Sequence, residues 1–160
     1  MLQLPTKLRW ARKRLSDGVS NRLRTFAGGR FAGFCRPTWI SLLLTERCNA
    51  RCLHCDIWKN RGPEDSPTKE QWAAALTDLR RWLGPAHVCL TGGEALLKPY
   101  AIDLVEHGAR LGLFIELLTH GFWKDQSKIE RLALANPWRV TLSLDAIGEI
   151  HDRIRGREGF

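Results

Sequence analysis

The sequence lacks any apolar run long enough to cross a bilayer, which excludes the helical membrane-spanning class. Such a helix needs about 20 consecutive apolar residues, and runs such as Trp39–Leu44 are far shorter. The N-terminus also lacks the uninterrupted apolar core of a secretory signal, because Lys7, Arg9 and Arg12 break it up. We therefore expect a cytoplasmic protein with no transmembrane segment.

Cysteines are few and odd in number, which argues against a disulfide-stabilised fold. The chain of 160 residues has five of them: Cys35, Cys48, Cys52, Cys55 and Cys89. Three lie within eight positions in the pattern C-x3-C-x2-C, and such a group indicates a reducing compartment and a metal site. Thiolates suit iron–sulfur clusters, zinc or Cu(I). We expect Cys89 to be a small buried hydrophobic residue and Cys35 to lie outside the ligand set.

Acidic residues are almost absent from the first 36 positions. This segment holds nine Lys or Arg and one acid, Asp17, and so carries the whole net charge of +8. Apolar residues recur in it at helical spacing: Leu8, Leu15, Val19, Leu23 and Phe26. We predict a basic amphipathic helix and linker over residues 1–36, followed by a domain over 37–160. The apolar stripe is expected to pack on the domain; a membrane-surface, nucleic-acid or partner-binding role and a transit peptide are alternatives.

From residue 37 onward, short apolar runs alternate with segments of helical period. The predicted strands are Trp39–Leu44, buried on both faces, His87–Thr91, Leu113–Leu118 and Arg139–Leu144; the predicted helices run from Ser66 or Thr68 to Leu83, from Tyr100 to Leu111 and from Lys124 to Ala135. This alternation predicts an α/β fold with a parallel sheet. Four such units are too few to close a barrel. We therefore expect either a truncated product or a partner chain that covers the open sheet edge.

The residues with chemical potential follow the strands. The cysteines come after the first strand, Gly92-Gly93-Glu94 after the second, His120-Gly121 after the third and Asp145 after the fourth. In parallel α/β sheets, ligands bind beyond the carboxyl ends of the strands. The sequence therefore predicts one site at this edge, with Trp58 and Trp123 near a substrate cavity.

Together, C-x3-C-x2-C, Thr91-Gly-Gly-Glu94 and Ser143-Leu-Asp145 resemble the radical S-adenosylmethionine (SAM) enzymes. The stretches Leu44–Asn49 and His151–Gly156 are similar to the branch that includes the molybdenum-cofactor cyclase and SPASM-type peptide-modifying enzymes. The resemblance covers about residues 38–160. It implies a partial (β/α)6 barrel, of which this chain looks like the N-terminal two-thirds.

The resemblance also implies the cofactors. A [4Fe–4S] cluster would be held by Cys48, Cys52 and Cys55, and SAM would bind the fourth iron. One electron, from a flavodoxin- or ferredoxin-like reductant, would cleave SAM to a 5′-deoxyadenosyl radical. The radical would abstract hydrogen from a peptide or small-molecule substrate.

Six further residues are implied to contact SAM: His54, Gly92, Gly93, Glu94, Ser143 and Asp145. The glycines would let the backbone approach the methionine part, and Glu94 would accept a hydrogen bond from its ammonium group. Ser143 would reach the ribose or carboxylate; Asp145 would do the same or face the substrate. His54 would stack near the adenine. Many relatives have Thr-Asn-Gly where this chain has Thr119-His120-Gly121, so the implied third-strand contact differs here.

The alternative is a non-catalytic module with structural zinc. Three thiolates and a histidine complete a tetrahedral zinc site. His120 is a better candidate for this histidine than His54, which lies between Cys52 and Cys55, too close in sequence to reach the metal easily. Such a module would bind nucleic acid or a partner through the basic arm. His87 and His107 are expected to be surface or hydrogen-bonded structural groups.

Overall fold

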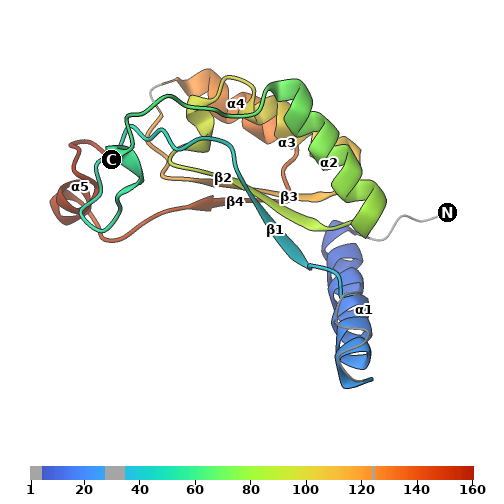
Figure 1. The fold of residues 1–160 in the computed structure, drawn as a ribbon. Coiled ribbons are helices and arrows are strands. Elements are labelled where there is room, and N and C mark those ends of the chain that lie inside the picture. The colour runs from blue at the N-terminus through green and yellow to red at the C-terminus, as the bar shows by residue number, and fades with distance from the viewer. Residues whose placement is uncertain (1–4, 28–34, 124) are drawn as a thin grey trace.

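The computed structural model describes residues 5–27, 35–123 and 125–160. Four strands form one parallel sheet in the order β1-β2-β3-β4 (Figure 1). The strands are β1 (Trp39–Leu43), β2 (His87–Thr91), β3 (Phe114–Thr119) and β4 (Arg139–Leu142); the helices are α1 (Thr6–Phe26), α2 (Lys69–Leu83), α3 (Ala101–Arg110), α4 (Gln126–Leu134) and α5 (Glu149–Arg155), with short 3-10 helices η2 (Ile57–Lys59) and η3 (Ala95–Leu97). The predicted α/β class with a parallel sheet is confirmed. No helix in the described ranges is long and apolar enough to cross a membrane.

Helices α2, α3 and α4 cover one face of the sheet (Figure 1). The side chains that β2 and β3 send to this face include Val88, Leu90, Ile115 and Leu117, and all four are fully buried. Gly108 lets helix α3 approach β3 closely, since a Cβ at this position would lie only 2.4 Å from Ile115 Cδ1. The hydrophobic core therefore lies on this helix-covered face and holds the strands in position.

Strand β1 departs from expectation. Its residues Trp39, Ser41 and Leu43 are exposed, so the predicted burial on both faces is wrong for this strand. The strand lies at the edge of the sheet, and the helices cover only the opposite face. The inner strands behave as the pattern predicts, since β2 is buried along its first four residues.

Local signals explain the boundaries of α2. Thr68 caps the helix and forms a capping box with Gln71, in which each side chain bonds the other residue's backbone N–H. The helix ends at Gly84, whose φ of 73° favours glycine. Other predicted elements shift by one or two residues. The start predicted at Lys124 lies outside the described residues, and α5 and η3 were not predicted.

A polar network fills the other face of the sheet near its amino end. Glu116 accepts hydrogen bonds from Arg139 Nε and Nη2 (3.0 and 2.7 Å) and from Thr141 Oγ1, and it lies 2.7 Å from His87 Nε2. Burial opposes ionisation of Glu116, but these partners together hold its pKa below the usual value. Burial also lowers the pKa of His87. His87 is thus the hydrogen-bonded structural group that we expected.

Helix α1 lies at the amino end of the strands, away from the cysteine loop (Figure 1). Trp10 stacks on Trp138 with ring centroids 5.1 Å apart. The predicted basic helix is therefore present, but its apolar stripe does not pack on the domain. Leu15 and Leu23, for example, are exposed. The expectation of a packed stripe is wrong, and the division of the chain at residues 36 and 37 stays a prediction.

Candidate cofactor site

The glycine-rich turn after β2 is bonded to the segment that leads into the first cysteine. Leu44 N–H donates to Thr91 O (2.8 Å), Gly93 N–H to Thr45 O (2.8 Å) and Glu94 N–H to Arg47 O (2.9 Å). These bonds continue the β1–β2 pairing beyond the strands. They fix the path of the chain up to Cys48.

The two glycines are needed for this contact. A Cβ at Gly92 would lie 2.4 Å from Thr45 O, and one at Gly93 would lie 2.3 Å from Arg47 O. Gly92 also has a φ of 149°, which favours glycine. The backbone approach that the glycines permit is therefore an approach to residues 45–47. Their contact with the methionine part of SAM stays a prediction.

The three cysteines occupy one loop between β1 and η2. Cys52 is buried and Cys48 and Cys55 are half-buried. Burial raises the pKa of the Cys48 thiol, the nearby Cys52, Glu94 and Cys55 raise it further, and the Ala50 N–H opposes them. Among the residues that the structure describes, no three metal-ligating side chains are gathered for a single ion. In a cubane cluster each thiolate binds a different iron, so such convergence is not required.

The end of α5 holds the other side of this loop. Arg51 N–H donates to Arg155 O and Leu53 N–H to Ile154 O, both at 2.9 Å. Gly156 adopts a left-handed φ of 64°, and a Cβ there would lie 2.4 Å from Arg51 O. The cysteine loop is thus held between two segments, one after β2 and one after β4.

A buried arginine lies beside the middle cysteine. Arg155 Nη1 is 3.6 Å from Cys52 Sγ, and Arg155 Nε is 2.8 Å from Asp145 Oδ2. The Nε–H is not aligned with a hydrogen-bond acceptor, so the second contact is an ion pair only. His151 Nδ1 accepts the Asp145 N–H at 3.3 Å. Asp145, which we expected near SAM or substrate, is therefore linked through Arg155 to the cysteine loop.

Glu94 is 2% exposed and its carboxylate is held by neighbours in the chain. It accepts hydrogen bonds from the Leu96 N–H (3.0 Å), the Thr119 hydroxyl (2.9 Å) and the His120 N–H (3.0 Å). A carboxylate has about four acceptor positions. The Thr119 hydroxyl is within 2.9 Å of both oxygens, and His120 Nε2 lies 3.2 Å from Oε2, so polar groups surround the carboxylate on both oxygens.

His120 is engaged on both ring nitrogens. Its Nδ1 accepts the Phe122 N–H at 3.0 Å, which assigns the proton to Nε2, and Nε2 lies 2.7 Å from Asn49 Oδ1. Burial lowers the pKa of His120, as Arg155 and Arg157 also do, against the opposing effect of Glu94. A neutral His120 bonded to the cysteine loop through Asn49 is thus a structural partner of the loop. It has no ring nitrogen free for zinc.

A cavity of about 250 Å³ lies beside Glu94, slightly below the range of roughly 300–1,000 Å³ that is usual for ligand pockets. Its lining includes Asn49, Glu94, Phe122, Trp123 and Arg157. The expected position of Trp123 at a cavity agrees with this lining. Trp58 instead donates its Nε1–H to Cys52 O at 3.3 Å.

Ser143 and His54, the remaining predicted SAM contacts, are less buried than Glu94. Ser143 is half-buried, and its N–H donates to Thr119 O at 3.0 Å. His54 is exposed on the cysteine loop. The structure brings Ser143 to the same sheet edge as Glu94, while the roles of both side chains toward SAM stay predictions.

The α5 contact yields a testable prediction for the loop. We expect Gly156→Ala to lower the iron retained by the protein after anaerobic reconstitution, because the new Cβ collides with Arg51 O. Gly159→Ala is the matched control, since Gly159 also has a left-handed φ (77°) but has nothing within 4 Å of its Cβ position. Both variants carry a strain of roughly 1–2 kcal/mol. Equal iron content in the two variants would contradict the role of Gly156.

Comparison with known proteins identifies the family. The family described as the radical SAM superfamily matches residues 42–160. The chain belongs to the radical SAM superfamily. It is 31% identical over 124 residues to the sporulation killing factor maturation protein SkfB of Bacillus subtilis (77% of this chain, 30% of SkfB) and 34% identical over 128 residues to the PqqA peptide cyclase of Methylocella silvestris (77% and 33%). The chain spans about a third of the length of these curated relatives.

Solved structures show the same fold. SuiB of Streptococcus suis superimposes with a TM-score of 0.64 in its complex with the precursor peptide SuiA and 0.65 in its complex with SAM. The sequence identity is 18%, and the match covers 76% of this chain and 27% or 28% of SuiB. The partial radical SAM fold predicted from the sequence is therefore confirmed.

Radical SAM enzymes use a [4Fe–4S] cluster and SAM, and the residues present fit both groups. One loop supplies three thiols, and backbone hydrogen bonds hold this loop on two sides. The guanidinium of Arg155 lies at the sulfur of Cys52, where it would stabilise thiolate charge. Glu94 borders a cavity, and its neighbours hold its carboxylate in a fixed position there.

Proposed function

We propose that this chain forms the SAM-cleaving part of a radical SAM enzyme that acts on a peptide. The observation that carries the proposal is the convergence of the cysteine loop, the Gly92-Gly93-Glu94 turn and the end of α5 at one edge of a parallel sheet. In this proposal Cys48, Cys52 and Cys55 hold the cluster. Their three thiolates leave one iron with an open position for SAM.

The other residues orient SAM and keep water away. Glu94 accepts a hydrogen bond from the ammonium group, and the buried surroundings strengthen this charge-assisted bond. Ser143 and Asp145 contact the ribose or carboxylate from the end of β4, and His54 lies toward the adenine. Gly92 and Gly93 hold the turn that presents Glu94. The chemistry that the bound cofactors supply is one-electron cleavage of SAM to a 5′-deoxyadenosyl radical, which abstracts hydrogen from the substrate.

A peptide substrate is favoured by the relatives. One similar protein is named a PqqA peptide cyclase, and SuiB has been solved with a precursor peptide. A small molecule is the second class, since an AdoMet-dependent heme synthase of Methanosarcina barkeri is 30% identical over 124 residues (77% of this chain, 36% of that protein). We also propose a cytoplasmic location and a flavodoxin- or ferredoxin-like electron donor.

Anaerobic purification and reconstitution test the cofactor assignment. We expect a brown protein with about four iron and four sulfide per chain, which releases 5′-deoxyadenosine from SAM on reduction with dithionite. A colourless protein that binds one zinc per chain and leaves SAM intact would support the zinc-stabilised module instead.

Isotope transfer tests the substrate class. With a perdeuterated peptide digest as substrate, deuterium is expected in the released 5′-deoxyadenosine, because the radical takes hydrogen from the substrate. A perdeuterated small-metabolite extract is the parallel sample. Transfer from the metabolite extract alone would contradict the peptide proposal while leaving SAM cleavage intact.

A further inference from the structure

Helix α1 presents an unpartnered apolar stripe. Five large apolar side chains form it, Leu8, Leu15, Val19, Leu23 and Phe26, with exposed fractions between 50% for Val19 and 93% for Phe26. No residue of this helix is buried. Large apolar groups exposed along a whole helix face indicate an interaction surface.

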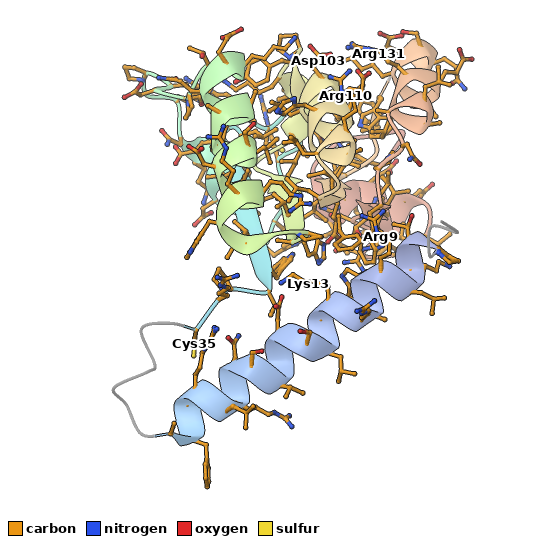
Figure 2. All side chains as sticks on the ribbon, turned by 90° about the vertical axis from the view of Figure 1, so that its right-hand side faces the viewer. Arg9, Lys13, Cys35, Asp103, Arg110 and Arg131 are labelled. Carbon is orange, nitrogen blue, oxygen red and sulfur yellow. The ribbon has the colours of Figure 1, made fainter. Side chains whose placement is uncertain are left out.

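The opposite side of α1 is the side that contacts the domain. Trp10 stacks on Trp138 of the domain, and Asn21 bonds the backbone of Arg36, just before the domain begins, at 2.8 and 3.0 Å. Lys13, which pairs with Asp17, points toward the domain in Figure 2. These polar and aromatic contacts set the rotation of the helix. The apolar stripe therefore faces away from the domain.

Arginines lie within and beside the stripe. By the helical period, Arg12 lies between the directions of Val19 and Leu23, and Arg22 lies at the border beside Leu15. Both are exposed residues, whereas Arg9 turns toward the domain, where its Nη2 would lie 3.7 Å from a Cβ at Gly112. The one acid of the helix, Asp17, is paired with Lys13 on the domain side. The exposed surface of α1 thus combines an apolar row with two outward-facing arginines.

This combination of apolar and basic side chains limits the kinds of partner that could bind the stripe. Nucleic acid needs the cations but not a row of Leu, Val and Phe. A second copy would bring the same exposed arginines, Arg12 and Arg22, against each other. An electron donor must approach the cysteine loop, which lies at the other end of the strands (Figure 1). A surface that is both apolar inside and anionic outside is that of a bilayer with acidic lipids.

We propose that α1 is an interfacial helix that binds an anionic lipid surface. The stripe enters the boundary between headgroups and acyl chains, and the arginines extend to the phosphates. The helix lies at one end of the molecule (Figure 2). Since its stripe faces away from the domain, a flat surface can reach the stripe without contacting the sheet. The cysteine loop is then held away from the membrane. The proposal does not depend on the cofactor assignment.

Vesicle sedimentation with the full chain tests the proposal. We expect binding to vesicles of phosphatidylcholine with phosphatidylglycerol, at least tenfold weaker binding to pure phosphatidylcholine vesicles, and weaker binding at high salt. Leu15→Glu should lower binding to the anionic vesicles at least tenfold. Ser20→Glu is the matched control, because it adds the same charge at a half-buried residue farther round the helix from the apolar row. Its effect should stay below about fivefold, which corresponds to the roughly 1 kcal/mol that one charge near an anionic surface contributes.

Three results would overturn the proposal. The first is an absence of vesicle binding by a protein whose circular dichroism shows that it is folded. The second is a dimer in light scattering that Leu15→Glu converts to a monomer, which would assign the stripe to contact between copies. The third is salt-dependent binding to duplex DNA that is stronger than vesicle binding and unaffected by Leu15→Glu, which would assign the arm to nucleic acid.

Discussion

Replacing Cys52 by alanine is expected to reduce bound iron from about four per chain to background, because a cubane held by two thiolates loses a third of its protein ligands. Cys52 is the central cysteine of the loop, and a cation, Arg155 Nη1, lies 3.6 Å from its sulfur. The measurement is iron and sulfide content with visible absorbance after anaerobic reconstitution. Cleavage of SAM should be lost to the same extent.

Cys89→Ala is the matched control for this experiment. Cys89 is also buried, but it lies in β2 beside Glu116, and burial raises the pKa of its thiol to about 11. The substitution should cost about 1 kcal/mol of stability and leave the iron content unchanged. Loss of iron in Cys89→Ala, or full iron in Cys52→Ala, would contradict the proposed ligand set.

The fold was largely readable from the sequence because its signals are local. Continuous apolar runs predicted β2 and β3, and Ser66 or Thr68 was predicted to cap α2, of which Thr68 is the observed cap. The error at α1 has a physical reason. A helical apolar stripe shows that one face seeks a partner, but it does not say that the partner is this domain, and Trp10 and Asn21 fix the opposite face there instead.

The site was readable only in part. The cysteine spacing and Gly92-Gly93-Glu94 are short motifs, so their position after the strands could be predicted. The role of Arg155 could not, because its contacts with Arg51 and Cys52 join segments about a hundred residues apart. The motif His151–Gly156 was a signal that this segment matters, without showing what it touches.

Gly92 and Gly93 also show that a motif can be recognised in the sequence without revealing what its residues contact. The resemblance implied that Gly92 and Gly93 let the backbone approach SAM, which stays a prediction, and the structure shows a close approach to another part of the chain. Its partner within the described chain is the backbone at Thr45 and Arg47. A glycine in a motif can indicate that there is no room for a side chain, but only the tertiary structure shows which neighbouring group lies there.

Substituting Glu94 by glutamine is expected to affect both folding and SAM binding. The carboxylate accepts donors on both oxygens, the Leu96 N–H on Oε1 and the His120 N–H on Oε2. An amide keeps one of these oxygens and turns an NH2 group toward the other donor. One buried N–H is then unpaired, which should cost about 1–3 kcal/mol in urea unfolding.

The effect on SAM follows from the lost charge. A hydrogen bond to a charged group contributes roughly 1.5–3 kcal/mol, so Glu94→Gln should weaken SAM binding to the cluster-loaded protein about 10- to 150-fold. Equilibrium dialysis with labelled SAM measures this without turnover. The expected change exceeds what a loss of stability alone would give, because only folded, cluster-containing protein is compared.

Thr119→Val separates the two roles of Glu94. This substitution removes the hydroxyl that donates to Glu94 and that accepts the Gly121 N–H and the Trp123 Nε1–H, both at 3.1 Å. It should therefore lower stability by a similar amount, about 1–3 kcal/mol, while the carboxylate remains to meet the ammonium group. SAM affinity in Thr119→Val should change less than about threefold. If Glu94→Gln and Thr119→Val lower stability alike and neither alters SAM affinity, Glu94 is a structural anchor of the turn and does not bind SAM.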